Sequence, residues 1–337
     1  MRQGRGRWNH HNETCPQYRC ARRRVAGPQG PRNLVWNSMD SAIVVLDPAT
    51  GAVREHNPHK PLVYADDLAL TRAEGAFETL WLTQGVPRCY AAHLARFRRS
   101  AAALELPAPV AEHWTAATAL ATDMWVGAHP QKDAAVVWTY SRGRLGHPTA
   151  WVVAHAVDPE HSRMRREGVA VLTGSRGWLL DHANPSPWLL TGAKTLGYAA
   201  AMAAVRYARA HGAQDVIFTA GDRILEGTTS TVVADVDGTL VSPTPGPDVL
   251  AGTTQAALFA QAQRAGIPTQ LRELKKPELN RARGVWLVSS VRRAVPVTSI
   301  DGRAVGAHPA AIDVPGLTTQ ALSEAASWHA ARGVGGV

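Results

Sequence analysis

The chain has 337 residues, 45% of them hydrophobic, which is enough to build two modest domains with buried cores. No apolar run approaches the roughly 20 residues that span a bilayer, and the N-terminus lacks the apolar stretch of a secretory signal, so we expect a cytoplasmic protein with no membrane contact. Of the formal net charge of +9, residues 1–38 contribute +7 from eight Arg and one Glu, and the +2 left for the other 299 residues argues against nucleic acid as a partner.

The first segment of the chain, residues 1–38, is polar and Arg-rich and has neither helical nor strand periodicity, which predicts a disordered extension. Four residues of metal-binding type lie there: His10, His11, Cys15 and Cys20. Their C-x4-C spacing matches no strong zinc pattern, so we predict no metal site. The third cysteine is Cys89, and three cysteines form no disulfide framework, which fits a reducing compartment.

A small N-terminal α+β domain is predicted for residues 39–160. It begins with an apolar run at 42–46 that ends in a turn at 47–51, as a strand does. Residues 92–106 place Leu94, Phe97, Ala101 and Leu104 on one face, which indicates an amphipathic helix. The remaining elements expected here are a helix at 110–125 and strands at 134–140 and 150–157, with Ser141–Gly143 between the strands.

A larger C-terminal domain is predicted for residues 161–337. A strand at 169–173 precedes an Ala-rich helix at 195–211, which ends at Gly212 in a glycine C-cap. Further elements are expected as strands at 216–219, 224–225, 231–234, 239–241 and 285–289 and a helix at 254–266. The fold class expected from this order is α+β with two domains.

One lysine differs from the other four in its surroundings. The chain contains five Lys against 31 Arg. Four of the lysines lie in polar or charged segments: Lys60, Lys132, Lys275 and Lys276. Lys194 instead lies among apolar and small residues, where desolvation lowers the pKa of an amine and makes it the nucleophile that imine chemistry requires. The alternative is an ordinary lysine at a helix start, whose stem packs while its amine reaches solvent.

Two further segments offer groups for a phosphate-bearing ligand. Glu226 ends an apolar strand and is followed by small and hydroxyl residues at 227–230. The Gly252-Thr253-Thr254 segment precedes a helix, whose free N–H groups and positive dipole end bind anions. The alternatives are an exposed acid in a turn for Glu226 and a simple threonine N-cap for the second segment.

Four segments together resemble the class IV aminotransferases, also called fold type IV pyridoxal phosphate enzymes, over about residues 40–305. These segments are Glu74–Thr79 with His93–Arg96, Lys194–Leu196, Leu225–Ser230 and Leu250–Thr254. The resemblance implies a two-domain, D-amino acid aminotransferase-like fold with a small N-terminal and a larger C-terminal α/β domain. It also implies a homodimer whose active site lies near the domain and subunit interfaces.

The resemblance assigns roles to individual residues. Lys194 would form the Schiff base with pyridoxal 5'-phosphate and move protons, and Glu226 would pair with the pyridinium nitrogen. The remaining cofactor contacts would come from Arg96, Thr229, Gly252, Thr253, Thr254 and Ser290. Two departures from the family pattern are Glu74, where Asp is usual, and Gly197, where Asn or Ser is frequent. Tyr198 would either replace the lost polar contact or pack in the core of the helix.

Within this family the segments 188–196, 215–218 and 286–292 look most like aminodeoxychorismate lyases, as does Tyr140–Gly143. Such an enzyme eliminates pyruvate from 4-amino-4-deoxychorismate to give 4-aminobenzoate, a folate precursor. Arg142 or Arg144 is the candidate for holding a substrate carboxylate, the alternative being a surface arginine.

Two other functions stay open. One is an aminotransferase that acts on D-amino or branched-chain amino acids, since the cofactor residues are common to both reactions. The other is a nucleic-acid-binding or regulatory protein that kept the fold and uses the Arg-rich extension for contact.

Overall fold

The computed structural model describes residues 41–177, 186–190, 192–306, 312–323 and 326–333. Residues 37–337 form one compact unit. The predicted disordered extension, with His10, His11, Cys15 and Cys20, lies outside the described residues. Among those that are described, no helix is long and apolar enough to cross a membrane.

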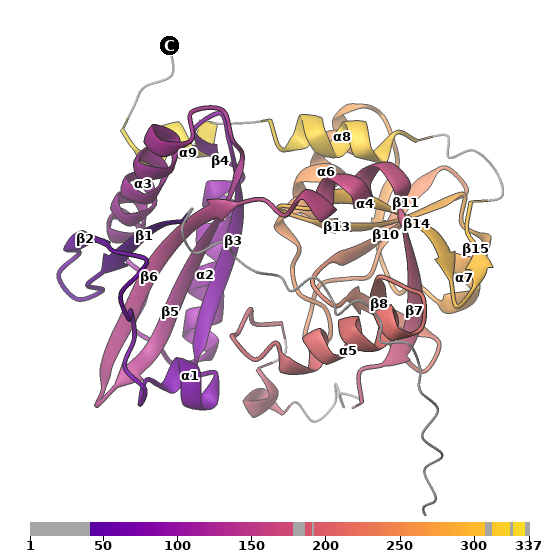
Figure 1. The fold of residues 1–337 in the computed structure, drawn as a ribbon. Coiled ribbons are helices and arrows are strands. Elements are labelled where there is room, and N and C mark those ends of the chain that lie inside the picture. The colour runs from indigo at the N-terminus through magenta and orange to yellow at the C-terminus, as the bar shows by residue number, and fades with distance from the viewer. Residues whose placement is uncertain (1–40, 178–185, 191, 307–311, 324–325, 334–337) are drawn as a thin grey trace, which may run out of the picture. The chain divides into compact units, whose positions relative to one another are not determined.

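The first sheet is antiparallel and has the strand order β2-β1-β6-β5-β3-β4. Its strands are β1 (Ser41–Leu46), β2 (Val53–His56), β3 (Gly75–Thr83), β4 (Val86–Pro87), β5 (Ala134–Arg144) and β6 (His147–Ala156). Three helices accompany it: α1 (Leu68–Arg72), α2 (Tyr90–Ala103) and α3 (Ala111–Ala128). In Figure 1, α2 and α3 lie along this sheet. Edge-to-face contacts of Phe97 with Trp114 and Trp138 fill the space between helices and sheet.

The second sheet is mixed and has the order β12-β11-β10-β13-β14-β7-β8-β9, with β15 paired to β14. Its strands are β7 (Val169–Ser175), β8 (Asp215–Ala220), β9 (Arg223–Gly227), β10 (Thr231–Val236), β11 (Thr239–Ser242), β12 (Thr269–Leu271), β13 (Gly284–Ser289), β14 (Arg293–Ile300) and β15 (Arg303–Ala304). The helices that follow α3 in the sequence are α4 (Pro159–Glu167), α5 (Ala199–Ala210), α6 (Thr253–Arg264), α7 (Lys276–Arg281), α8 (Val314–Ala321) and α9 (Ala326–Ala331), with a 3-10 turn at Pro187–Leu189. The predicted α+β class is therefore confirmed.

The predicted helix at 195–211 begins later than expected, at Ala199. Residues 194–196 are not helical, because their backbone forms hydrogen bonds with β3. Lys194 O accepts from Phe77 N at 3.1 Å, and Leu196 N donates to Gly75 O at 2.9 Å. These hydrogen bonds to β3 override the helical propensity of the local sequence.

The segment Ser141–Gly143, expected to separate two strands, is part of β5, and the turn lies at Leu145–Gly146. Gly143 keeps its place in the strand because its φ is +73°, and a Cβ there would lie 1.8 Å from the carbonyl oxygen of His147. A glycine is therefore required at a register shift in the β5–β6 pair.

The last helix returns to the first sheet. Trp328 of α9 is buried in the core around α2, where its ring centroid lies 5.0 Å from that of Tyr90. The expected border near residue 160 falls in α4, which lies in the sequence between the last strand of the first sheet and the first strand of the second. The end of the chain nevertheless contributes to the N-terminal core. The two-domain division with a border at 160 stays a prediction.

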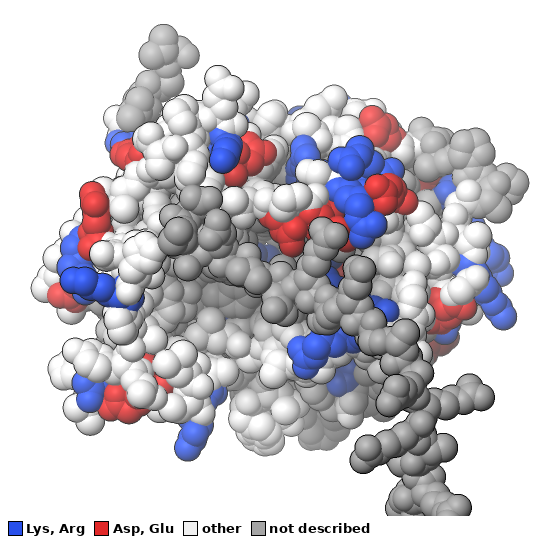
Figure 2. All heavy atoms as spheres, viewed as in Figure 1, with Lys and Arg blue, Asp and Glu red and all other residues white. Residues whose placement is uncertain are grey.

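Charged side chains of both signs are interspersed on the face shown in Figure 2. Among the described residues of that face, Lys and Arg do not merge into one broad basic area.

Candidate active site

A buried carboxylate organises the part of the site that belongs to the first sheet. Glu78 of β3 is fully buried and accepts from Arg96 Nε at 2.7 Å, from Arg96 Nη2 at 2.6 Å, and contacts His93 Nδ1 at 2.6 Å. His93 and Arg96 are three residues apart on α2, so they share the helix face that packs on β3. The bidentate pair fixes the guanidinium rigidly in place.

The charge states of this cluster follow from burial and pairing. Burial is the largest single influence and raises the pKa of Glu78, but the charges and hydrogen bonds of Arg96 and His93 together outweigh it and lower the pKa from 4.5 to about 2. Burial lowers the pKa of His93, so the imidazole is neutral near pH 7. Because the ionised Glu78 can only accept, His93 Nδ1 carries the proton and Nε2 is left as an acceptor.

His93 and Arg96 connect this cluster to the second sheet. Arg96 Nη1 donates to Ala251 O at 2.9 Å. His93 Nε2 lies 3.3 Å from Thr253 Oγ1 and 3.2 Å from Ser290 Oγ, so both hydroxyls can donate to it. Four of the residues predicted from the resemblance therefore gather around one imidazole and one guanidinium: Arg96, Thr253, Thr254 and Ser290, with Thr254 Oγ1 3.5 Å from Ser290 Oγ.

The N-terminus of α6 completes a cradle for an anion. Its N-cap, Gly252, provides no side-chain cap, so the N–H groups of the first turn lack that partner. A Cβ on Gly252 would lie 2.4 Å from Thr231 Oγ1, so a side chain there would force Thr231 to shift. The helix dipole and the Arg96 guanidinium favour negative charge in the same place.

Lys194 lies beside this cradle in a partly buried, largely aromatic setting. Its amine is 3.1 Å from Tyr198 OH and 4.1 Å from the centroid of the Phe77 ring. Its backbone N–H donates to Ser100 Oγ at 2.9 Å, which ties the segment to α2. Among the described residues Lys194 has no carboxylate partner. Tyr198 is thus a contact of the amine as well as a packing residue, since its ring meets Phe77 edge-on at 5.0 Å.

Glu226 is held from two sides at the end of β9. Its Oε1 accepts from Arg176 Nη2 at 2.5 Å and its Oε2 from Leu250 N at 3.0 Å. Arg176 also donates to Asp248 O at 2.7 Å. Glu226 and Tyr198 both lie close enough to Arg96 to help raise its pKa, although burial, which lowers it, and the charge of Glu78 are larger influences.

Thr229 occupies a different setting from the other predicted hydroxyls. Its Oγ1 accepts from Arg292 Nη2 at 2.9 Å, and Arg292 Nη1 donates to the buried Asp215 at 2.9 Å. Asp215 also accepts from Thr228 Oγ1 at 2.6 Å. These bonds fix the loop that follows Glu226, and the Thr229 hydroxyl is engaged by Arg292.

The two candidate substrate arginines are separate from the cluster around Lys194. Arg142 Nε donates to Glu74 Oε2 at 2.7 Å and also bonds to Leu104 O. Arg144 pairs with Asp66 at 2.9 Å and lies over the Tyr64 ring at 4.4 Å. The backbone N–H of Arg142 donates to the carbonyl of Glu74. Glu74 precedes Gly75, whose carbonyl accepts from Leu196, so the backbone of Arg142 is linked to the segment that carries Lys194.

Several residues of the site were not assigned a role from the sequence. Glu78 and His93 lie in the segments that carry the resemblance, and the helical spacing of His93 and Arg96 was the signal available for their pairing. Phe77, Ser100 and Arg176 gave no such signal, because their partners are distant in sequence. Among the described residues no group of three or more His, Cys, Asp or Glu is placed to hold a metal ion.

Comparisons with known proteins show the family to which this chain is similar. A family model described as amino-transferase class IV matches residues 75–300. A protein of Mycobacterium tuberculosis (strain ATCC 25618 / H37Rv) named bifunctional aminodeoxychorismate lyase / D-amino acid transaminase is 41% identical over 264 residues, which are 75% of this chain and 91% of the relative. The PLP-bound form of a hypothetical aminotransferase from M. tuberculosis superimposes with a TM-score of 0.79 at 38% identity, covering 83% of this chain and 98% of the other. A fold IV transaminase from Curtobacterium pusillum gives a TM-score of 0.77 at 35% identity, with coverages of 84% and 98%.

Proposed function

Because this chain belongs to the class IV aminotransferase family, we propose that it is a pyridoxal phosphate-dependent lyase that converts 4-amino-4-deoxychorismate into 4-aminobenzoate and pyruvate. The observation that carries the proposal is the Lys194 amine, which lies 3.1 Å from Tyr198 OH and within electrostatic reach of His93, in the cluster where Tyr198 and Glu226 both act on Arg96. The lyase reaction is supported by the name of the relative that is 41% identical. The same name supports a D-amino acid transaminase as the second candidate.

The donor set fits pyridoxal phosphate. Arg96, the N–H groups at the start of α6 and the hydroxyls of Thr253, Thr254 and Ser290 suit a phosphate. Glu226 suits a protonated ring nitrogen, since Arg176 and Leu250 N donate to its two oxygens and fix the side chain in place. When bound, the cofactor supplies a ring that withdraws electrons from the substrate carbon bearing the amine.

The residues of the chain then have distinct tasks. Lys194 Nζ removes the proton from the amine-bearing carbon of the substrate and returns one to the departing enolpyruvyl group, which leaves as pyruvate when its C–O bond breaks. Tyr198 OH, 3.1 Å from Nζ, orients the amine. The substrate ring becomes aromatic, and atoms balance without any oxidant or keto acid. Thr229 contributes by holding the loop after Glu226 in place.

A substrate with two carboxylates needs cationic groups beyond the cofactor site. We propose Arg144 for this task, because its only ion pair among the described residues is with Asp66, whose side chain is 57% exposed. An exposed pair contributes little and exchanges readily for a substrate carboxylate. Arg142, with Glu74 and Leu104 O as partners, has less freedom and supports the strand beside Lys194.

The assembly and setting of the enzyme are also proposals. We propose a cytoplasmic homodimer that makes 4-aminobenzoate for folate or a related pathway. The dimer is proposed from the family to which the chain belongs.

The experiment that tests the lyase uses enzymatically prepared 4-amino-4-deoxychorismate. The holoenzyme is expected to release 4-aminobenzoate and pyruvate in equal amounts without a keto acid, as followed by chromatography. A D-amino acid with 2-oxoglutarate provides the parallel assay. Turnover only in the second assay would make the protein a transaminase and contradict the lyase proposal.

Replacing Glu226 by Gln is expected to lower kcat about 10²-fold with little change in KM, because a fixed charge opposite the ring nitrogen stabilises the transition state more than the bound substrate. Glu112→Gln removes an exposed carboxylate on α3 and is the matched control, with unchanged kcat. A kcat for the Glu226 variant equal to that of the control would contradict the proposed role of Glu226 in the active site.

A further inference from the structure

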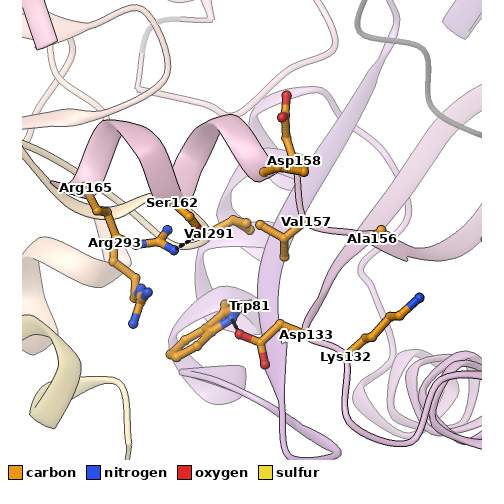
Figure 3. Close-up of a pocket in the computed structure, with 11 residues that line it drawn as sticks. Trp81, Lys132, Asp133, Ala156, Val157, Asp158, Ser162, Arg165, Val291 and Arg293 are labelled. Atoms are coloured by element: carbon orange, nitrogen blue, oxygen red, sulfur yellow. Dashed lines mark hydrogen bonds between the residues drawn. The ribbon is translucent and has the colours of Figure 1, made fainter. Parts of the chain in front are cut away.

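One cavity is lined by residues other than those of the candidate active site. It has a volume of about 330 Å³ and is formed where the end of β6 meets α4 and the turn between β13 and β14. Its walls include the indole of Trp81, the side chains of Val157 and Val291, and two arginines, Arg165 and Arg293 (Figure 3). None of these residues takes part in the contacts of Lys194, Glu226 or the α6 cradle.

Arg293 is held there at a cost to the backbone. Its φ is +61°, a left-handed conformation that is strained for a side-chain-bearing residue and that glycine adopts freely. Yet among the described residues its guanidinium has neither a hydrogen bond nor an ion pair, and its one contact is with the Trp81 ring, 4.9 Å from the centroid. Burial lowers the pKa of Arg293, so the charge is partly withdrawn from water without a paired acceptor.

Arg165 brings a second positive charge to the same wall. Its Nη2 donates to Ser162 Oγ at 2.7 Å, and it forms no ion pair with a described residue. Burial and, after it, the like charge of Arg293 lower the pKa of Arg165 to about 10, and the charge of Asp133 opposes them. Two half-buried guanidinium groups that repel each other are a favourable place for an anion, which would relieve the repulsion.

The acids nearby do not neutralise this pair by direct contact. Asp133 accepts from Trp81 Nε1 at 3.1 Å, and its charge reaches both arginines only through space. Asp158 accepts from Glu160 N at 2.8 Å as the N-cap of α4, and in Figure 3 its carboxylate points away from the arginines. The side chain of Lys132 also points away from them.

We propose that this cavity is a binding site for a small carboxylate with an apolar body. Arg165 and Arg293 would bind the carboxylate, and the Trp81 indole with Val157 and Val291 would cover the apolar part. The apolar walls favour an organic acid over a bare inorganic anion, because an inorganic anion has no apolar surface to bury against them. The site is distinct from that for the substrate, which lies beside Lys194.

Calorimetric titration of the holoenzyme with benzoate tests the site, with acetate and sulfate titrated in parallel. Benzoate is expected to bind more tightly than either, and Arg293→Gly and Arg165→Ala are each expected to weaken it about 10-fold or more. Arg293→Gly suits the left-handed backbone, so its melting temperature should not fall. Arg166→Ala, an exposed neighbour on α4, removes the same charge and should leave affinity unchanged.

Other outcomes overturn the proposal. Equal benzoate affinity in the wild type, Arg293→Gly and Arg165→Ala would place the ligand elsewhere, and a loss confined to Arg144→Gln would place it in the substrate site. Sulfate binding as tight as benzoate, lost in the same two variants, would show an inorganic anion site and contradict the choice of an organic acid. Loss of affinity in Arg166→Ala equal to that in the two cavity variants would reduce the effect to general electrostatic attraction.

Discussion

Replacing Lys194 by Ala is expected to lower turnover at least about 10³-fold, whichever of the two reactions the enzyme catalyses. The Lys194 amine is the group that can both attach the cofactor and move the substrate proton, and the other described contacts of the segment are backbone bonds that an alanine preserves. Those bonds, to Phe77, Ser100 and from Leu196 to Gly75, predict that the variant folds normally. Steady-state rates measured with saturating pyridoxal phosphate provide the comparison.

Lys60→Ala is the matched control, because Lys60 is an exposed lysine in a loop of the N-terminal part. Its rate is expected to equal that of the wild type. A Lys194 variant that retained more than about a tenth of wild-type turnover would show that another group performs the proton transfer.

Replacing Glu78 by Ala is expected to lower the free energy of unfolding by about 3–5 kcal/mol, because Arg96 would remain buried without its counter-charge. The carboxylate is fully buried and holds both nitrogen-bearing side chains of the cluster. Denaturant unfolding measures the difference. Glu74→Ala breaks the pair with Arg142, whose side chains are 37% and 38% exposed, and is expected to cost only about 0–1 kcal/mol.

The effect of Glu78 depends on pH in a defined direction. Its pKa is about 2 in the folded protein against 4.5 for the free side chain, so the ionised form is favoured by folding. The stabilisation is therefore complete above about pH 4.5 and is lost as the pH falls from there through about 2. The difference in stability between wild type and Glu78→Gln should shrink over that window. A difference that stayed constant from pH 7 to 3 would contradict the proposed ion pair.

The elements of the fold were largely predictable because their signals are local. The face formed by Leu94, Phe97 and Ala101 gave α2, and alternation and turn residues gave most of the strands. Two boundaries were wrong because distant contacts decide them. The backbone bonds of Lys194 and Leu196 to β3 keep that segment out of the helix, and Gly143 allows β5 to continue past the expected turn. The return of Trp328 to the first core had no local signal at all.

The candidate site divides in the same way. Lys194 and Glu226 stood out because a lone lysine among small residues and an acid at a strand end are visible in one segment. The partners that hold these groups lie far away: Arg176 is 50 residues from Glu226, and Ser100 is 94 residues from Lys194. The pairing of Glu78 with Arg96 needs β3 packed on α2, which only the folded chain provides. The cavity lined by Arg165 and Arg293 likewise depends on a turn and a helix brought together by the fold.

The most direct test of the account is to identify the residue that carries the cofactor. The holoenzyme would be reduced with borohydride, digested and analysed by peptide mass spectrometry. We expect one phosphopyridoxyl group per chain, on Lys194, and none on any peptide of the Lys194→Ala variant. Labelling of another of the five lysines, or no labelling of a protein that is active and saturated with the cofactor, would contradict it.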